Sequence, residues 1–266
     1  MSRIQSVFAS LKAQNKKALI PYITAGDPHP DQTVTLLHAM VAAGADMIEL
    51  GVPFSDPMAD GPVIQRASER ALVHKMGLRK VLAMVKTFRE SDQQTPIILM
   101  GYANPIEAMG AAQFVELAQA SGVDGVLTVD YPPEECDTFN QALAAAGIDS
   151  IFLLSPTTEP SRTDLIVKQA TGFLYYVSLK GVTGAANLDI TEVKKRVAEI
   201  RQQTTLPIGV GFGVKDAATA REVASIADAV VVGSRMVLAI EQSDAASLQA
   251  NVQALVKELR TAIDSV

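Results

Sequence analysis

The choice of fold depends most on the stretch ALIPYITAGDP, residues 18–28. Its first six residues are almost continuously apolar, which is typical of a strand in a parallel sheet. An open, doubly wound sheet usually follows its first strand with a glycine-rich turn that binds a dinucleotide. The turn here, Thr24-Ala25-Gly26-Asp27-Pro28, does not have that pattern. The stretch therefore favours the other common arrangement, a closed barrel of parallel strands.

Short apolar runs, separated by helical patterns, recur along the 266 residues. Most start about 20 to 35 residues after the previous run, which is the length of a βα unit. We predict strands at 18–23, 46–50, 96–100, 124–129, 150–154, 173–177, 207–210 and 228–232. The fold class predicted is α/β, a (β/α)8 TIM barrel that forms one domain over residues 1–266. We also predict an added amphipathic N-terminal helix and extra helices in the second and eighth units.

Composition excludes several classes of function. The formal net charge of −6 and the pI of about 5.1 argue against nucleic acid as a partner, because phosphate backbones require a dense basic field. Cys136 is the only cysteine, and His29, His38 and His74 have no ligand spacing, so no metal site is expected. No apolar run could span a bilayer, and the N-terminus lacks the apolar core of a signal peptide. We expect a cytoplasmic protein that does not bind membranes.

The stretch MIELGVPFSDPMADGP, residues 47–62, carries the first candidate catalytic groups. Side chains alternate along a strand, so Glu49 points into the barrel if Ile48 and Leu50 point outward. Its position is the C-terminal end of a strand, where barrel enzymes keep their chemistry. A carboxyl group in apolar surroundings has a raised pKa, which suits a general acid or base. The alternative is structural: Glu49 ends a strand in a salt bridge, and Asp56 and Asp60 cap the proline-rich loop.

Glycine turns follow three of the last strands. They are GVGFGV at 209–214, VGSR at 232–235 and GVTG at 181–184. Small residues let backbone N–H groups approach an anion, and Ser234 could cap a helix whose N-terminus faces it. The loops after the seventh and eighth strands are the usual phosphate site of such barrels. Each glycine alone could be a simple turn, but together they favour a phosphate site.

These motifs resemble the tryptophan synthase alpha subunit family. The resemblance is carried by residues 48–61 and also covers 21–28, 102–105, 181–184, 211–213 and 233–234, in order along nearly the whole chain. It implies retro-aldol cleavage of indole-3-glycerol phosphate to indole and glyceraldehyde 3-phosphate. By this analogy Glu49 protonates indole C3, and Asp60 pairs with the indole nitrogen.

The resemblance also implies the residues that hold the substrate. The phosphate would be held by Gly184, Gly213, Gly233 and Ser234. The indole pocket would be lined by Tyr22, Met100, Leu127, Tyr175, Thr183 and Phe212. Tyr22 is a departure, because the family also has phenylalanine there, and the added hydroxyl could form a hydrogen bond or narrow the pocket.

A partner is implied in the same way. The family works with a beta subunit that contains pyridoxal phosphate, in an alpha2beta2 heterotetramer, and no cofactor is expected in this chain. Pro53, Phe54, Asp56 and Pro57 are candidate contacts with that partner.

Three other functions remain open. The protein could be a lyase of the same family that works without a partner, or another phosphate-binding barrel enzyme, such as an isomerase or a Schiff-base aldolase that uses Lys180. It could also be a binding subunit that activates its partner and catalyses little itself. Only the lyase hypotheses account for Glu49 and Asp60 together.

Overall fold

The computed structural model describes residues 1–177, 190–211 and 213–266. Its strands form one sheet in the order β5-β4-β3-β2-β1-β9-β8-β7-β6, and every hydrogen-bonded pair in it is parallel. The strands are β1 Ala18–Thr24, β2 Ile48–Gly51, β3 Ile97–Gly101, β4 Gly125–Thr128, β5 Asp149–Ser150, β6 Phe152–Leu154, β7 Leu174–Val177, β8 Ile208–Gly211 and β9 Ala229–Val232. Each predicted strand is confirmed, with ends within two residues of those expected.

The sheet closes on itself through the predicted strand at 150–154. β5 and β6 stand at opposite ends of the strand order, yet only Ile151 separates them in the chain. Ile151 N–H donates to the carbonyl of Val126 at 2.9 Å, and the carbonyl of Ser150 accepts from Thr171 N–H at 2.9 Å. The segment therefore bonds to both of its neighbours, and the fold is the predicted TIM barrel with its fifth strand in two pieces.

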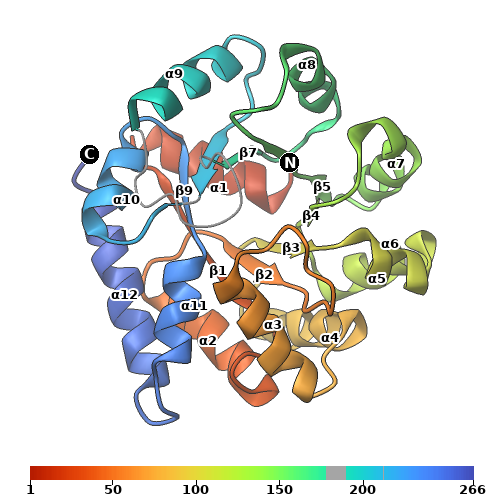
Figure 1. Ribbon diagram of the computed structural model, residues 1–266, viewed down its shortest axis with the longest axis vertical. Coiled ribbons are helices and arrows are strands. Elements are labelled where there is room, and N and C mark those ends of the chain that lie inside the picture. The colour runs from red at the N-terminus through yellow and green to blue at the C-terminus, as the bar shows by residue number, and fades with distance from the viewer. Residues whose placement is uncertain (178–189, 212) are drawn as a thin grey trace.

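Helices surround the strands (Figure 1). They are α1 Arg3–Ala13, α2 Pro30–Ala42, α3 Pro62–Val73, α4 Leu78–Arg89, α5 Ala103–Met109, α6 Ala111–Ser121, α7 Asp137–Ala145, α8 Pro160–Gln169, α9 Ile190–Arg201, α10 Ala217–Ala224, α11 Ser234–Glu241 and α12 Leu248–Ile263, with a short 3-10 helix η1 at Pro133–Glu135. α1 is the predicted N-terminal helix, and α3 and α11 are the predicted extra helices of the second and eighth units. The short helix α5 in the third unit was not expected from the sequence.

The apolar core has two main parts, as strand alternation requires. The larger part lies between the barrel and the outer helices, and it contains outward side chains such as Ile48 and Leu50. The smaller part fills the barrel interior with inward side chains such as Ile20, Met47 and Phe173. Helix α1 belongs to the interior part through three buried residues, Ile4, Phe8 and Leu11. It covers the N-terminal end of the barrel and leaves the C-terminal end as the place for a site.

Among the helices in the described part of the chain, none has both the length and the apolar character needed to cross a membrane.

Candidate active site

Glu49 lies on β2 and points into the barrel, as the sequence predicts. In the parallel register it stands beside Tyr22 of β1, and only 2% of its surface is exposed. No described residue donates a hydrogen bond to its carboxyl group. Burial, and after it the nearby charge of Asp60, together raise the pKa of Glu49 to about 8. Glu49 therefore holds its proton at neutral pH and can act as a general acid.

Asp60 lies on the loop between β2 and α3. Helix α3 begins at Pro62, two residues after Asp60. Proline is favoured at the first position of a helix, because that position needs no N–H donor. The Asp60 carboxyl is partly buried, and burial raises its pKa to about 6 although a hydrogen bond with Tyr102 lowers it. Asp60 is mostly ionised at neutral pH, so the two acids of this site carry different charges there.

Tyr102 begins the sequence motif at 102–105, whose pattern by itself indicates no role for the side chain. Its hydroxyl accepts a hydrogen bond from Ala59 N–H at 3.0 Å and is bonded to the Asp60 side chain. Its ring lies against Phe54, with ring centroids 5.0 Å apart. Tyr102 follows β3 directly, and this position at a strand end is the signal that could have identified it. It ties the loop that carries Asp60 to the third unit of the barrel.

The predicted apolar wall gathers around Glu49. Tyr22, Leu127 and Tyr175 are buried, and Met100 is partly buried and packs against the interior cluster. The parallel register places Met100 beside Leu127. The pKa of Tyr175 is raised by burial first and by the charge of Glu49 second, so its hydroxyl lies near that acid. Four of the six predicted pocket residues therefore share the barrel interior near Glu49.

Two glycines, Gly51 and Gly211, shape this wall together with Thr24. The hydroxyl of Tyr22 is bonded to Thr24 Oγ1 at 3.1 Å. A Cβ atom at Gly51 would lie 2.1 Å from the same hydroxyl, so a side chain at that position of β2 would displace the Tyr22 ring. Across the barrel, a Cβ at Gly211 would lie 2.3 Å from the Tyr175 hydroxyl. Glycines on β2 and β8 thus make room for the two tyrosines.

The phosphate candidates that are described lie at the ends of β8 and β9. Gly213 is exposed, with φ of 78°, a backbone conformation that favours glycine. Gly233 precedes α11, and an added Cβ there would lie 3.9 Å from Cβ of Tyr22. Ser234 is exposed and is the first helical residue of α11, whose N-cap is Gly233 with no side-chain cap bond. The expected capping role of Ser234 is therefore wrong. The start of α11 lies near Tyr22.

Several predicted residues lie outside the described part of the chain. They are Lys180, Thr183, Gly184 and Phe212.

The loop after β2 also holds the candidate partner contacts. Asp56 is exposed and accepts a hydrogen bond from Ser55 at 2.6 Å, while Phe54 and Pro57 are half-buried. Pro53 is buried within the chain, and its contact with a partner stays a prediction. Met58 adds an apolar side chain that is 72% exposed.

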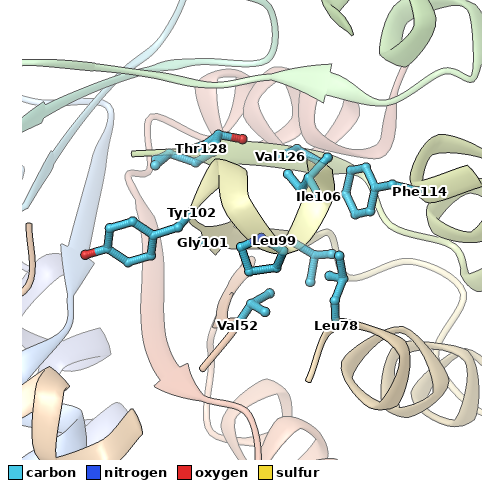
Figure 2. Close-up of a pocket in the computed structure, with 11 residues that line it drawn as sticks. Val52, Leu78, Leu99, Gly101, Tyr102, Ile106, Phe114, Val126 and Thr128 are labelled. Atoms are coloured by element: carbon cyan, nitrogen blue, oxygen red, sulfur yellow. The ribbon is translucent and has the colours of Figure 1, made fainter. Parts of the chain in front are cut away.

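Two small cavities lie between the barrel wall and the helices around it. The first is lined by residues of β3, β4, α5 and α6 together with Val52 and Leu78 (Figure 2). Figure 2 shows the hydroxyl of Tyr102 turned away from the other lining side chains. The second lies between β4, the β5–β6 segment and α7, and includes Cys136. Within the residues described, no group of three His, Cys, Asp or Glu side chains could hold a metal ion.

The chain is similar to proteins of one family over its whole length. A family model for the tryptophan synthase alpha chain matches residues 8–264. A tryptophan synthase alpha chain from Nitrosomonas europaea is 60% identical over 265 residues, which cover 100% of this chain and 96% of that one.

Solved structures agree with this match. A crystal structure of tryptophan synthase subunit alpha from Legionella pneumophila is 46% identical, with a TM-score of 0.93 and coverage of 100% of both chains. A structure of tryptophan synthase from M. tuberculosis in an aminoacrylate-bound form is 33% identical, with a TM-score of 0.89, over 99% of this chain and 100% of that one. This chain therefore belongs to the tryptophan synthase alpha chain family, a family of lyases.

Proposed function

We propose that this protein cleaves indole-3-glycerol phosphate to indole and glyceraldehyde 3-phosphate, with Glu49 and Asp60 as its catalytic residues. One observation supports these roles above all. The barrel mouth holds a buried carboxyl group with a pKa of about 8 beside a carboxylate with a pKa of about 6. Two acids whose surroundings separate their pKa values can act as proton donor and anion in one reaction.

The chemistry needs both groups. The bond to be broken joins indole C3 to the first carbon of the glycerol chain, and C3 leaves well only after it is protonated. Glu49 supplies that proton, and the ring becomes an indolenine-like cation with positive charge on nitrogen. Asp60 faces the indole N–H, so its attraction grows as that charge develops in the transition state. The glycerol hydroxyl then loses its proton to form the aldehyde, and the ionised Glu49 can take that proton, which balances the reaction.

The remaining described residues fit the two ends of such a substrate. Tyr22, Met100, Leu127 and Tyr175 form an apolar wall for the indole ring, while Gly213, Gly233 and Ser234 would bind the phosphate. A helix start and a glycine turn offer backbone N–H groups to an anion. Phe212, Thr183 and Gly184 stay candidates from the sequence. The reaction needs no metal and no organic cofactor in this chain.

We further propose that the chain works as a single domain with a beta subunit that holds pyridoxal phosphate, in an alpha2beta2 assembly. One closed sheet that includes all described strands supports the single domain. The contact surface proposed is the exposed side of the loop after β2, with Phe54, Asp56 and Pro57.

The test is turnover of indole-3-glycerol phosphate by the purified protein, with and without a beta subunit. Glu49→Gln and Asp60→Asn should each reduce kcat/KM about 100- to 10,000-fold, because each removes a group that acts in the transition state. The plot of wild-type kcat/KM against pH should be bell-shaped, because Asp60 must be ionised and Glu49 protonated, with limbs near pH 6 and pH 8.

Glu69→Gln on the exposed side of α3 is the control for the loss of one carboxylate, and it should retain full activity. Full activity in both catalytic variants would overturn the proposed mechanism. A wild-type protein with no turnover under either condition would overturn the proposed function.

A further inference from the structure

A buried carboxylate stands outside the catalytic pair. Asp27 lies in the turn after β1, and its side chain is 0% exposed. Arg70 of α3 donates two hydrogen bonds to it, from Nε at 2.6 Å and from Nη2 at 2.9 Å. This paired arrangement uses the flat guanidinium of arginine, which lysine cannot reproduce. Burial raises the pKa of Asp27, while Arg70 acts in the opposite direction.

The same arginine also reaches the end of another helix. Arg70 Nη1 donates to Glu241 Oε1 at 2.7 Å, and Glu241 is the last residue of α11. Arg66, one turn earlier on α3, donates to both oxygens of Glu241 at 2.8 and 2.9 Å. Asp27, Arg70, Glu241 and Arg66 thus form one network, which we call the α3–α11 clamp.

The clamp joins elements whose other ends carry the proposed site. α3 begins two residues after Asp60, and α11 begins at Ser234. An eight-residue helix is about 12 Å long, so Glu241 is about two turns from Ser234. Between the clamp and the site, Ala67 of α3 and Val237 of α11 are fully buried in one cluster with Tyr22. In Figure 1, α3 and α11 lie beside each other next to β1, as their contacts require.

We propose that Arg70 is a positioning residue, which fixes α3 against α11 so that Asp60 and the phosphate-binding start of α11 keep their separation. Asp60 must meet the indole nitrogen while α11 holds the phosphate at the other end of the same molecule. A shift of one helix against the other would misplace one end of the substrate, and misplacement by about 1 Å can cost about 100-fold in rate. This inference rests on the proposed function.

A matched arginine allows positioning to be separated from stability. Arg260 of α12 also bridges two acids, with Nη1 2.8 Å from Asp46 and Nη2 2.8 Å from Asp264. It lies at the opposite end of the barrel, where it also bonds to the carbonyl of Lys17 just before β1. Arg260→Lys therefore removes a similar ion pair far from the catalytic acids.

The experiment compares Arg70→Lys and Arg260→Lys with the wild-type protein. The measurements are kcat and KM for indole-3-glycerol phosphate, the Kd of glycerol 3-phosphate and the midpoint of thermal unfolding. Both variants should lower the midpoint. Only Arg70→Lys should raise the Kd of glycerol 3-phosphate and the KM, each about 10-fold, and lower kcat about 10-fold. Glu241→Gln, which keeps the shape of the side chain, should shift the same constants in the same direction but less.

If folded Arg70→Lys has the same kcat, KM and Kd of glycerol 3-phosphate as the wild-type protein, the proposal is overturned. The proposal is also overturned if Arg260→Lys changes these constants as much as Arg70→Lys does. If Arg70→Lys does not fold, unchanged constants in Glu241→Gln overturn it instead. Failure of the proposed function gives a different result, because then the wild-type protein itself does not turn over the substrate.

Discussion

At the scale of single residues, the surroundings of each acid decide its charge. Glu49 is enclosed by the barrel interior and has no hydrogen-bond donor among the described residues, so its neutral form is favoured. Asp60 is less buried and is bonded to Tyr102, so it ionises at lower pH. The same chemical group thus has a different charge at neutral pH at positions 49 and 60.

Tyr102→Phe tests this balance. The phenylalanine ring can still pack against Phe54, but the variant loses the hydrogen bond that favours ionised Asp60. We expect kcat to fall about 10-fold, in keeping with about 1.5 to 3 kcal/mol for a hydrogen bond to a charged group, part of which is lost only in the transition state. The acid limb of the kcat/KM profile should move to higher pH, because the pKa of Asp60 rises.

Tyr131→Phe is the control for Tyr102→Phe. It also removes a tyrosine hydroxyl, one that is bonded to Glu107 at the surface after β4. Its pH profile should match the wild type. An unchanged profile in Tyr102→Phe as well would show that the hydroxyl does not act on Asp60.

At the scale of elements, the role of α1 is structural and not catalytic. Its buried face enters the interior cluster, where the Phe8 ring lies 5.8 Å from that of Phe173. Ser2 starts the helix with a capping box that includes Gln5, and the Ser2 hydroxyl also donates to Asp149 at 2.5 Å. The helix therefore closes the barrel at the end opposite to Glu49.

Phe8→Ala should lower the free energy of unfolding by about 3 to 5 kcal/mol, because it leaves a cavity in a packed core. Urea unfolding gives this value, and Lys12→Ala on the exposed side of α1 is the control. The kcat of Phe8→Ala should stay within about threefold of the wild type at a temperature where it is folded. A loss of kcat as large as that of Glu49→Gln would contradict a purely structural part for this helix.

At the scale of the whole molecule, the raised pKa of Glu49 makes stability depend on pH. Between its ordinary pKa of 4.5 and the folded value of about 8, the folded state keeps a proton that the unfolded state has lost. The unfolded state binds fewer protons there, so stability falls as pH rises through this window. Above pH 8, the raised pKa of Glu49 thus lowers the free energy of unfolding by a few kcal/mol.

Glu49→Gln should remove this loss of stability. Relative to the wild type, the variant should become more stable as pH rises from 5 to 9, by up to a few kcal/mol in urea unfolding. For Glu69→Gln, on the exposed side of α3, the plot of unfolding free energy against pH should run parallel to that of the wild type. If the curve of Glu49→Gln is also parallel to the wild type, the carboxyl is not protonated in the folded state.

Local patterns in the sequence predict where the strands lie and to which face of the sheet Glu49 points. Each strand is a short apolar run, and the two-residue period of a strand is set by the backbone itself. Because Ile48 and Leu50 are apolar and face the helices, the same period predicts that Glu49 faces the barrel interior. The helix at 103–109 was not found, because it has only seven residues and contains Pro105 near its start. A helix this short has too little periodic pattern to be recognised.

Only the tertiary structure decided what these residues touch. The pKa values of Glu49 and Asp60 depend on burial and on Tyr102, which comes from another unit of the barrel. Arg70 meets Glu241 across 171 positions of the chain. Such contacts depend on how distant elements pack, and no periodicity within one segment records them. The sequence by itself predicted the barrel, the family resemblance and the two candidate acids. Packing determined the charges of these acids and the α3–α11 clamp, which we propose fixes Asp60 relative to the start of α11.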